Sequence, residues 1–222
     1  MLDKLPVLLA VSVEQEKEAL EQGLGKQSTI EVIVCGVGFA AAAANTAKQL
    51  STKPYRGVIN IGIAGGFPKR AAIGSIVAAS SIIAPEIGAE SPEGFISIDE
   101  LGFGTQKQQA RIDRQLVGKL SHSYHVHEGI ILSVLTATGT EKTYLEREKL
   151  GAIAEAMEGY GVAAAAKSFN LPFSELRTIS NEVGVRDKSK WNFPLAFKGI
   201  KKIGQTIKEV EQDEYCLFSV SE

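Results

Sequence analysis

The sequence predicts an α/β fold with a mixed, mostly parallel central sheet flanked by helices. Short apolar runs rich in Val, Ile and Ala recur along the chain with little polar alternation, which is typical of strands buried on both faces. Segments with helical spacing lie between several of these runs. Alternation of buried strands and helices favours a parallel sheet whose faces are covered by helices.

The order of the elements follows from these two patterns. Seven apolar runs, several of which end at a glycine, are predicted strands: residues 6–13, 30–38, 57–66, 74–84, 129–136, 151–158 and 175–184. Four segments have helical spacing or are rich in alanine, and we predict helices over residues 14–24, 40–50, 160–170 and 191–212. Residues 85–104 contain two prolines and four glycines without a period, which indicates a functional loop or a short β-excursion over a site.

The composition limits the kinds of partner. The chain has 222 residues, of which 44% are hydrophobic, so it can form one full core, and we predict a single domain over residues 1–222. Its formal net charge is −2, with both signs spread along the chain. Binding to nucleic acid or to an anionic membrane would need a basic patch. We therefore expect a small-molecule partner, no nucleic acid and no membrane.

Cysteine and histidine positions indicate neither disulfides nor a metal. Cys35 and Cys216 form no disulfide framework and no metal-binding spacing, which fits a reducing cytoplasm. No apolar stretch reaches about 18 residues, and the N-terminal segment LDKLPVLLAVSVEQE lacks the basic start of a secretory signal, so we expect a soluble, unprocessed, cytoplasmic protein. All three histidines lie in HSYHVH (122–127), where we predict an edge strand and no metal site.

In open α/β sheets, ligands bind outside the carboxyl ends of the strands, so the residues that end each run are the candidates for a site. The segment CGVGFA (35–40) has the GxGxxA pattern of dinucleotide-binding turns. However, the acidic residue expected about 20 positions later is missing. We interpret these glycines as serving a tight turn and close helix packing, and we predict no cofactor.

The segment NIGIAGG (60–66) ends another predicted strand. Its glycines, with Gly62 beside Ile63 and Ala64, let the backbone lie against a flat ligand and offer it N–H and C=O groups. A plain turn is the other interpretation. No arginine or lysine follows before Lys69, so this stretch is not typical of a phosphate-binding loop.

Carboxylates follow two of the predicted strands. In EAMEGYG (155–161), Glu158 can accept two hydrogen bonds from adjacent ribose hydroxyls, with Met157 as a soft apolar wall. The alternative is a solvated glutamate at a helix N-terminus. Glu14, Glu16 and Glu18 follow the first strand, and one of them could activate a water as general base while the others are exposed.

The strand ends, taken together, carry a family resemblance. RTISNEVG (177–184) ends in an amide, Asn181, where proton chemistry would more often use an ionisable group. In chain order, VSVEQEKEAL, NIGIAGG, LSVLTATGT, AMEGYGVA and RTISNEVG resemble the nucleoside phosphorylase superfamily, and within it the nucleosidases that hydrolyse purine nucleosides. The specific part is AMEG followed by R-x-I-S-N.

The resemblance implies the superfamily's fold and a role for each sugar-side candidate. Glu158 would hold the ribose hydroxyls, with Met157 packed beside the sugar. The backbone of Gly62, Ile63 and Ala64 would line the site.

The resemblance also implies that water attacks the sugar. Glu16 would activate that water, with Glu14 as the second choice. Asn60 stands where the phosphorylases of the superfamily carry an arginine for phosphate, which favours water over phosphate as the nucleophile.

Asn181 bears on the identity of the base. The superfamily's adenine-nucleoside cleavers have an aspartic acid at the corresponding place, which protonates N7 as the base leaves. An asparagine can instead donate a hydrogen bond to a 6-oxopurine while its oxygen accepts one from a protonated neighbour. Within the superfamily this pattern is most similar to the futalosine hydrolases, which release hypoxanthine from futalosine in the alternative menaquinone pathway.

Membership of that family would imply a large aromatic, carboxylate-bearing group on the 5′ side of the substrate, and a homo-oligomer. Arg186, Lys188 or Lys190 could face the carboxylate, and Trp191 or Tyr160 could stack on the ring; a solvated basic loop is the alternative. Two other functions stay open. One is a methylthioadenosine/S-adenosylhomocysteine nucleosidase or a purine nucleoside phosphorylase of the same fold, and the other is a nucleoside-binding module without catalysis.

Overall fold

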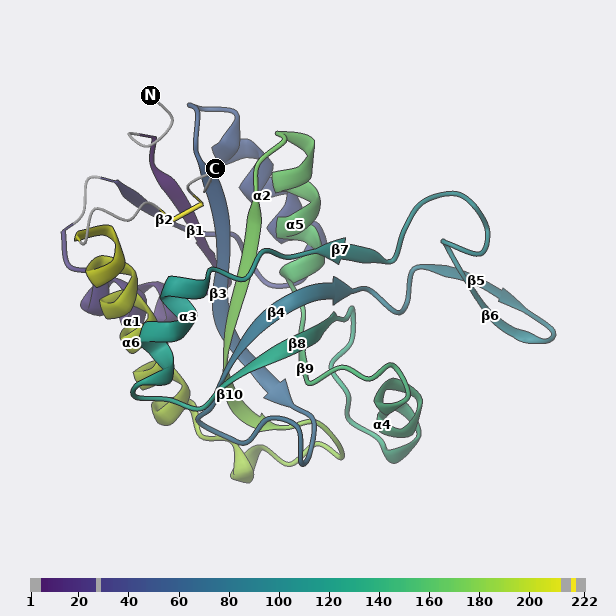
Figure 1. Cartoon of the computed structure of the whole chain (residues 1–222). Helices are drawn as coiled ribbons and strands as arrows, with labels where there is room; N and C mark the ends of the chain where they lie inside the picture. The colour runs from purple at the N-terminus through teal and green to yellow at the C-terminus, as the bar shows by residue number, and fades with distance from the viewer. Residues whose placement is uncertain (1–4, 27–28, 213–216, 219–222) are drawn as a thin grey trace.

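The computed structural model describes residues 5–26, 29–212 and 217–218 (Figure 1). Its strands are β1 (Val7–Val11), β2 (Ile30–Val34), β3 (Gly57–Gly66), β4 (Ile76–Ile83), β5 (Gly88–Ser91), β6 (Gly94–Ser97), β7 (Lys107–Gln109), β8 (Val126–Ser133), β9 (Ala154–Ala156) and β10 (Phe173–Glu182). Its helices are α1 (Glu14–Leu24), α2 (Phe39–Leu50), α3 (Arg114–Ser121), α4 (Glu141–Glu148), α5 (Gly159–Ser168), the short 3₁₀ turn η2 (Lys188–Lys190) and α6 (Phe193–Gln212).

The strands form one eight-stranded sheet and a separate two-stranded hairpin. β3 is the hub of the sheet, since it pairs in parallel with β1 and β10 and its last two residues pair antiparallel with β9. β10 also pairs with β4, β4 with β8, and β8 with β9, so these strands and β3 close a ring. On the other side of β3, β2 extends the sheet beyond β1. Parallel pairings outnumber antiparallel ones, so the predicted mixed, mostly parallel sheet flanked by helices is confirmed.

Two helical layers bury the strands on both faces. α1, α3 and α6 lie on one side of the sheet and α2 and α5 on the other (Figure 1). Leu8 and Ala10 of β1 pack in the core beneath α2 and α5, whereas Val7, Leu9 and Val11 pack in the core with α1 and α6. All five side chains are fully buried, which is why the strand shows no polar alternation.

Some predicted elements differ from the structure. The predicted strand over 151–158 is only three residues long, because the chain turns at Glu158 to begin α5. The helices α3 and α4 were not predicted, since both are short and their sequences are strongly polar. Each begins at a capping side chain: Asp113 accepts the N–H of Leu116, and Thr140 that of Thr143.

Residues 85–104 contain a β-hairpin made of β5 and β6, which projects away from the body of the molecule (Figure 1). The predicted β-excursion is therefore present, but none of its residues lines the cavity described below. Phe103, in the loop after β6, is 82% exposed. Among the described residues, no helix is long and apolar enough to cross a membrane.

Candidate active site

A cavity of about 230 Å³ lies where β1, β3, β8, β9 and β10 reach their carboxyl ends. Its walls come from the ends of these strands and from the loops that follow them. It brings together six of the seven predicted site residues: Glu16, Ile63, Ala64, Met157, Glu158 and Asn181. Segments separated by more than a hundred positions in the sequence therefore meet at one cavity, as the strand-end argument requires.

Glu16 is the carboxylate of α1 that enters this cavity. Its side chain is only 2% exposed, whereas Glu14 and Glu18 are on the solvent side of the helix. Oε1 accepts the backbone N–H of Ile63 at 2.8 Å, and Oε2 accepts that of Ser12 at 2.7 Å. These bonds fix the carboxylate between the ends of β1 and β3.

Burial raises the pKa of Glu16 above its ordinary value of 4.5, while Arg177 and the N–H groups of Ile63 and Ser12 oppose the rise. Each carboxylate oxygen has two lone pairs, so Oε1 keeps one for a water in the cavity. A buried carboxylate with a raised pKa and a spare acceptor position has the properties of a general base.

Glu158 lies between β9 and α5 and is 5% exposed. Its Oε1 accepts the N–H of Gly38 at 3.2 Å, and its Oε2 lies 3.2 Å from Nη1 of Arg177. Glu158 is the residue that precedes α5, but its side chain is buried and makes no hydrogen bond to the start of that helix, so the alternative of a solvated glutamate is wrong. Met157 beside it is half-buried and lines the cavity.

Asn181 is half-buried at the end of β10 and lines the cavity. Its Oδ1 accepts from the hydroxyl of Ser180 at 2.9 Å, and its Nδ2 donates to the carbonyl of Glu182 at 2.9 Å. An amide has two N–H donors and two oxygen lone pairs. One donor and one acceptor position therefore remain for a ligand, and the two local bonds hold the amide in place.

Gly62 is the predicted residue that does not line the cavity. It lies behind the carboxylate: a Cβ at this position would stand 2.5 Å from Nη1 of Arg177 and 2.8 Å from Oε1 of Glu16. Both distances are under 3.0 Å, so any side chain at this position would force Arg177 and Glu16 to shift. Its neighbours Ile63 and Ala64 provide the wall.

Arg177 is the functional residue that the sequence analysis did not assign. It is fully buried in β10, and its guanidinium donates to Oε1 of Glu175 at 2.7 Å, to the carbonyl of Ile63 at 3.4 Å and to Oδ1 of Asn60. The signal was two charged residues, Glu175 and Arg177, two positions apart in a predicted buried strand. Residues at that spacing point to the same face of a sheet.

With this geometry established, comparisons with known proteins place the chain. A family model described as the phosphorylase superfamily matches residues 9–210. The chain belongs to the phosphorylase superfamily.

Relatives within the superfamily agree with the predicted family. A futalosine hydrolase of Streptomyces coelicolor is 42% identical over 177 residues, which are 77% of this chain and 74% of the relative. A futalosine hydrolase of Acidothermus cellulolyticus is 40% identical over 212 residues, which are 87% of this chain and 86% of the relative. Several 5′-methylthioadenosine/S-adenosylhomocysteine nucleosidases are 29–31% identical. The predicted resemblance to the futalosine hydrolase family is confirmed.

A solved structure supports the fold. A variant of the Helicobacter pylori nucleosidase with 5′-methylthioadenosine in its active site superposes with a TM-score of 0.79 over 94% of this chain and 99% of that chain. The two sequences are only 16% identical, so this likeness bears on the fold alone. The predicted nucleoside phosphorylase-like fold is confirmed.

A superfamily member that uses phosphate as its nucleophile needs basic side chains that face the phosphate. Arg177 turns its guanidinium to carboxylates, an amide and a carbonyl of the chain itself. Asn60, where the phosphorylases have an arginine, is fully buried and accepts from Arg177 while donating to the carbonyl of Ala10 at 2.9 Å. Among the described residues that line the cavity, the one basic side chain is Arg186 at the rim.

The rim residues divide into two groups. Arg186 and Trp191 line the cavity, and the guanidinium lies over the indole ring at 5.1 Å from its centroid. Lys188 and Lys190 are exposed and do not line it. The hydroxyl of Tyr160 donates to the carbonyl of Thr105 at 2.5 Å, and this tyrosine does not line the cavity either.

The glycine turn 35–40 contributes to the site through its backbone. Gly36 and Gly38 both have positive φ, at 88° and 84°, which a non-glycine residue rarely adopts. The N–H of Gly38, at the start of α2, donates to Glu158. This N–H at a helix N-terminus, a group that often binds anions, is therefore directed to the chain's own carboxylate.

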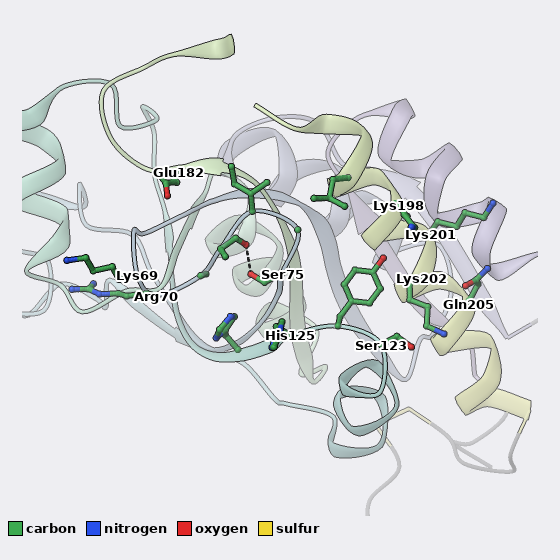
Figure 2. A pocket seen from close by; sticks show the side chains of 17 residues that line it. Lys69, Arg70, Ser75, Ser123, His125, Glu182, Lys198, Lys201, Lys202 and Gln205 are labelled. Carbon is green, nitrogen blue, oxygen red and sulfur yellow. Dashed lines mark hydrogen bonds between the residues drawn. The ribbon is translucent and has the colours of Figure 1, made fainter. Parts of the chain in front are cut away.

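A larger open groove of about 1060 Å³ lies elsewhere, between the β3–β4 turn, residues 123–127 and α6 (Figure 2). Lys69 and Arg70 lie at one end of it, and Lys198, Lys201 and Lys202 at the other, so its cations do not converge on one point.

This groove lacks the chemistry of the smaller cavity. Glu182 is the one carboxylate among its described lining residues, and it is exposed. His125 and His127 also line it, but within the described ranges no group of three or more His, Cys, Asp or Glu side chains could hold a metal ion. The smaller cavity is therefore the candidate active site.

Proposed function

We propose that this chain hydrolyses the N-glycosidic bond of futalosine, releasing hypoxanthine and dehypoxanthine futalosine in the alternative menaquinone pathway. The observation that carries the proposal is one cavity whose lining includes the buried carboxylates Glu16 and Glu158 and a strand-end amide, Asn181. The relatives at 40–42% identity that are named futalosine hydrolase support the choice of substrate.

In the proposed reaction, Glu16 accepts a proton from a water whose oxygen bonds to C1′ of the ribose. The C1′–N9 bond breaks at the same time, and its electron pair leaves with the purine. Glu158 accepts hydrogen bonds from the 2′- and 3′-hydroxyls and holds the sugar while C1′ acquires positive charge. A positioned general base contributes roughly 10² to 10⁴-fold to such a step.

Asn181 acts on the departing base. Its free N–H donates to N7 or to the C6 carbonyl of hypoxanthine, where the negative charge gathers as the bond breaks, and its free lone pair accepts from a protonated position of the ring. The amide gives up no proton, so the proton that neutralises hypoxanthine comes from solvent. This arrangement suits a 6-oxopurine, because adenine presents a donor at C6 in place of the carbonyl.

Water rather than phosphate is the proposed nucleophile. The basic group nearest to Glu16 and Glu158 is Arg177, and its donors are already directed to groups of the chain. At the rim, the Arg186–Trp191 pair offers a cation and an aromatic face to the aromatic, carboxylate-bearing 5′ group of futalosine.

A homo-oligomer and a cytoplasmic location belong to the same proposal. The projecting hairpin and the loop after it expose Phe95 at 51% and Phe103 at 82%, and exposed aromatic side chains of this kind favour contact with another protein surface. Cys35 is buried and unpaired, which fits a reducing compartment. Light scattering of the purified protein tests the oligomer directly.

The experiment that tests the function measures base release by chromatography from futalosine, inosine and methylthioadenosine, each with and without phosphate. We expect hypoxanthine from futalosine at a rate that phosphate does not change. Glu16→Gln should remove that activity, while Glu18→Gln, an exposed glutamate on the same helix, should retain it. Adenine from methylthioadenosine at a higher rate would point to the related nucleosidases, and a strict need for phosphate to a phosphorylase.

A further inference from the structure

The two cavity carboxylates belong to a buried charge cluster whose other members, Glu175 and Arg177, have no part in the proposed reaction. Glu16, Glu158 and Glu175 are 2%, 5% and 1% exposed, and Arg177 is fully buried among them. The cluster thus contains three carboxylates for one guanidinium. Buried charges of this kind are costly unless they are paired, so each has to be explained.

Glu175 does not line the cavity, and it contacts Arg177 from the side away from Glu158. Its Oε1 accepts from Nε of the guanidinium at 2.7 Å. Its Oε2 has no hydrogen-bond partner in the described part of the chain and packs against Gly159, where an added Cβ would lie 2.1 Å away. Gly159 is the first residue of α5, so the oxygen lies at the positive end of a helix.

The geometry favours an ionised Glu175. A proton on Oε2 would be a buried donor without an acceptor, whereas a carboxylate there faces the helix N-terminus and accepts from Arg177 through its other oxygen. Burial raises the pKa of Glu175, and Arg177 opposes the rise. Since Nε is the edge of Arg177 opposite to Glu158, the two carboxylates share the guanidinium without competing for one donor.

We infer that Glu175 is a positioning residue which acts through Arg177: its negative charge balances the guanidinium so that Glu16 stays basic enough to activate water. Without that charge, the single cation would be compensated by Glu16 and Glu158 alone, and Glu16 would hold a proton less tightly. The inference rests on the proposed hydrolysis. It assigns a task to a residue that touches neither the substrate nor the water.

The groups that face Glu16 are few, so the pH dependence can be interpreted. Arg177 faces it from β10, Glu158 from the start of α5, and the thiol of Cys35 lies near it after β2. Burial raises the pKa of Cys35 to about 12, so this thiol stays neutral throughout the working range. A shift of the acid limb, the fall of activity toward low pH, therefore reports a change in the charges of the carboxylates and Arg177 around Glu16.

The first test is the pH profile of kcat/KM for hypoxanthine release by Glu175→Gln. The glutamine has nearly the same shape, and its oxygen can still accept from Nε of Arg177, so mainly the charge is lost. We expect the acid limb to move down by about one pH unit, and the plateau to fall by about tenfold as the base weakens. Glu175→Asp, which keeps the charge, should restore the limb to its wild-type position.

A matched control is Glu211→Gln. Glu211 is buried and paired with Arg56 on the far part of α6, so this variant removes an equivalent charge away from the cavity. It should lower the melting temperature without moving the acid limb. If the acid limb of Glu175→Gln also lies at the wild-type pH, the inference is overturned and Glu175 has only a packing role.

The carboxyl groups of the wild-type chain provide a second test. In a ¹³C NMR titration of the glutamate carboxyls, with the signal of Glu175 assigned by its loss in Glu175→Asp, this group should remain ionised at the pH of maximal activity. Protonated Glu175 at that pH would refute the inference. Failure of the proposed function looks different, because the wild-type enzyme itself would then release no hypoxanthine from futalosine.

Discussion

Replacing Asn181 by alanine separates catalysis from stability. The change removes two local hydrogen bonds, one from Ser180 and one to the carbonyl of Glu182. Ser180 keeps a second acceptor, the carbonyl of Ala64 at 3.2 Å, so little is left unpaired. We expect a loss of about 1 kcal/mol in the free energy of unfolding, and a melting temperature lower by about 2–4 °C.

The expected loss of activity is much larger. Removing one preorganised donor to a developing anion typically costs about 10² to 10³-fold in kcat, or about 3–4 kcal/mol. A domain with about 5–15 kcal/mol of stability stays folded after losing about 1 kcal/mol, so unfolding cannot account for such a drop.

The assay is initial-rate hypoxanthine release from futalosine at saturating substrate, beside a melting curve of the same sample. Asn45→Ala is the matched control, because Asn45 donates one amide hydrogen bond to the carbonyl of Cys35 at 2.9 Å and does not line the cavity. If Asn181→Ala kept kcat within about twofold, or if both variants lost activity equally, the role of Asn181 at the leaving group would be refuted.

Four further predictions concern the carboxylates and the glycine behind them. Glu16→Gln should lower kcat by about 10² to 10⁴-fold with little change in far-UV circular dichroism; retained turnover would mean that another group activates the water. Because burial raises the pKa of Glu16 and a base works only when ionised, kcat/KM of the wild type should fall as the pH drops through a value above 4.5, which a pH-rate profile measures. Glu158→Gln should lower kcat/KM by about 10 to 100-fold for futalosine but much less for an analogue without the 2′- and 3′-hydroxyls, where an equal loss would contradict the ribose contact. Gly62→Ala should lower both the melting temperature and activity, because its Cβ would displace Arg177 and Glu16, while Gly118→Ala, with open space around it, should not.

The sequence predicted the parts of the fold that depend on local pattern. The run 57–66 became β3 with the same bounds, because nine residues of Val, Ile, Ala and Gly with one asparagine and no charge are compatible with a buried strand and with little else. α3 and α4 escaped prediction since eight residues give barely two turns, and their caps, Asp113 and Thr140, are common in loops as well.

The sequence alone predicted those site residues whose side chain suggests a chemical role at a strand end, such as a carboxylate or an amide. Glu16 could be chosen among three glutamates only through the family resemblance, and the structure shows the physical difference: one carboxylate turns inward to the N–H of Ile63 while its neighbours face solvent. Arg177 and Asn60 were not assigned to a common cluster because their contact joins β10 to β3, which are 117 positions apart. Such pairings depend on sheet register, and the local pattern does not determine it.

The buried charges are better explained by catalysis than by stability. A buried ion pair is often no more stabilising than apolar residues of the same volume, and here Arg177 faces more carboxylates than it can neutralise. Breaking an N-glycosidic bond, however, places positive charge on the sugar in the transition state. A site whose excess negative charge is fixed before the substrate arrives binds that transition state more strongly than the neutral ground state, which is the condition for catalysis. The same excess raises the pKa of Glu16, since Glu158 adds to the effect of burial. In the proposed reaction, one arrangement of charges would therefore both strengthen the base and stabilise the cation that its water attacks.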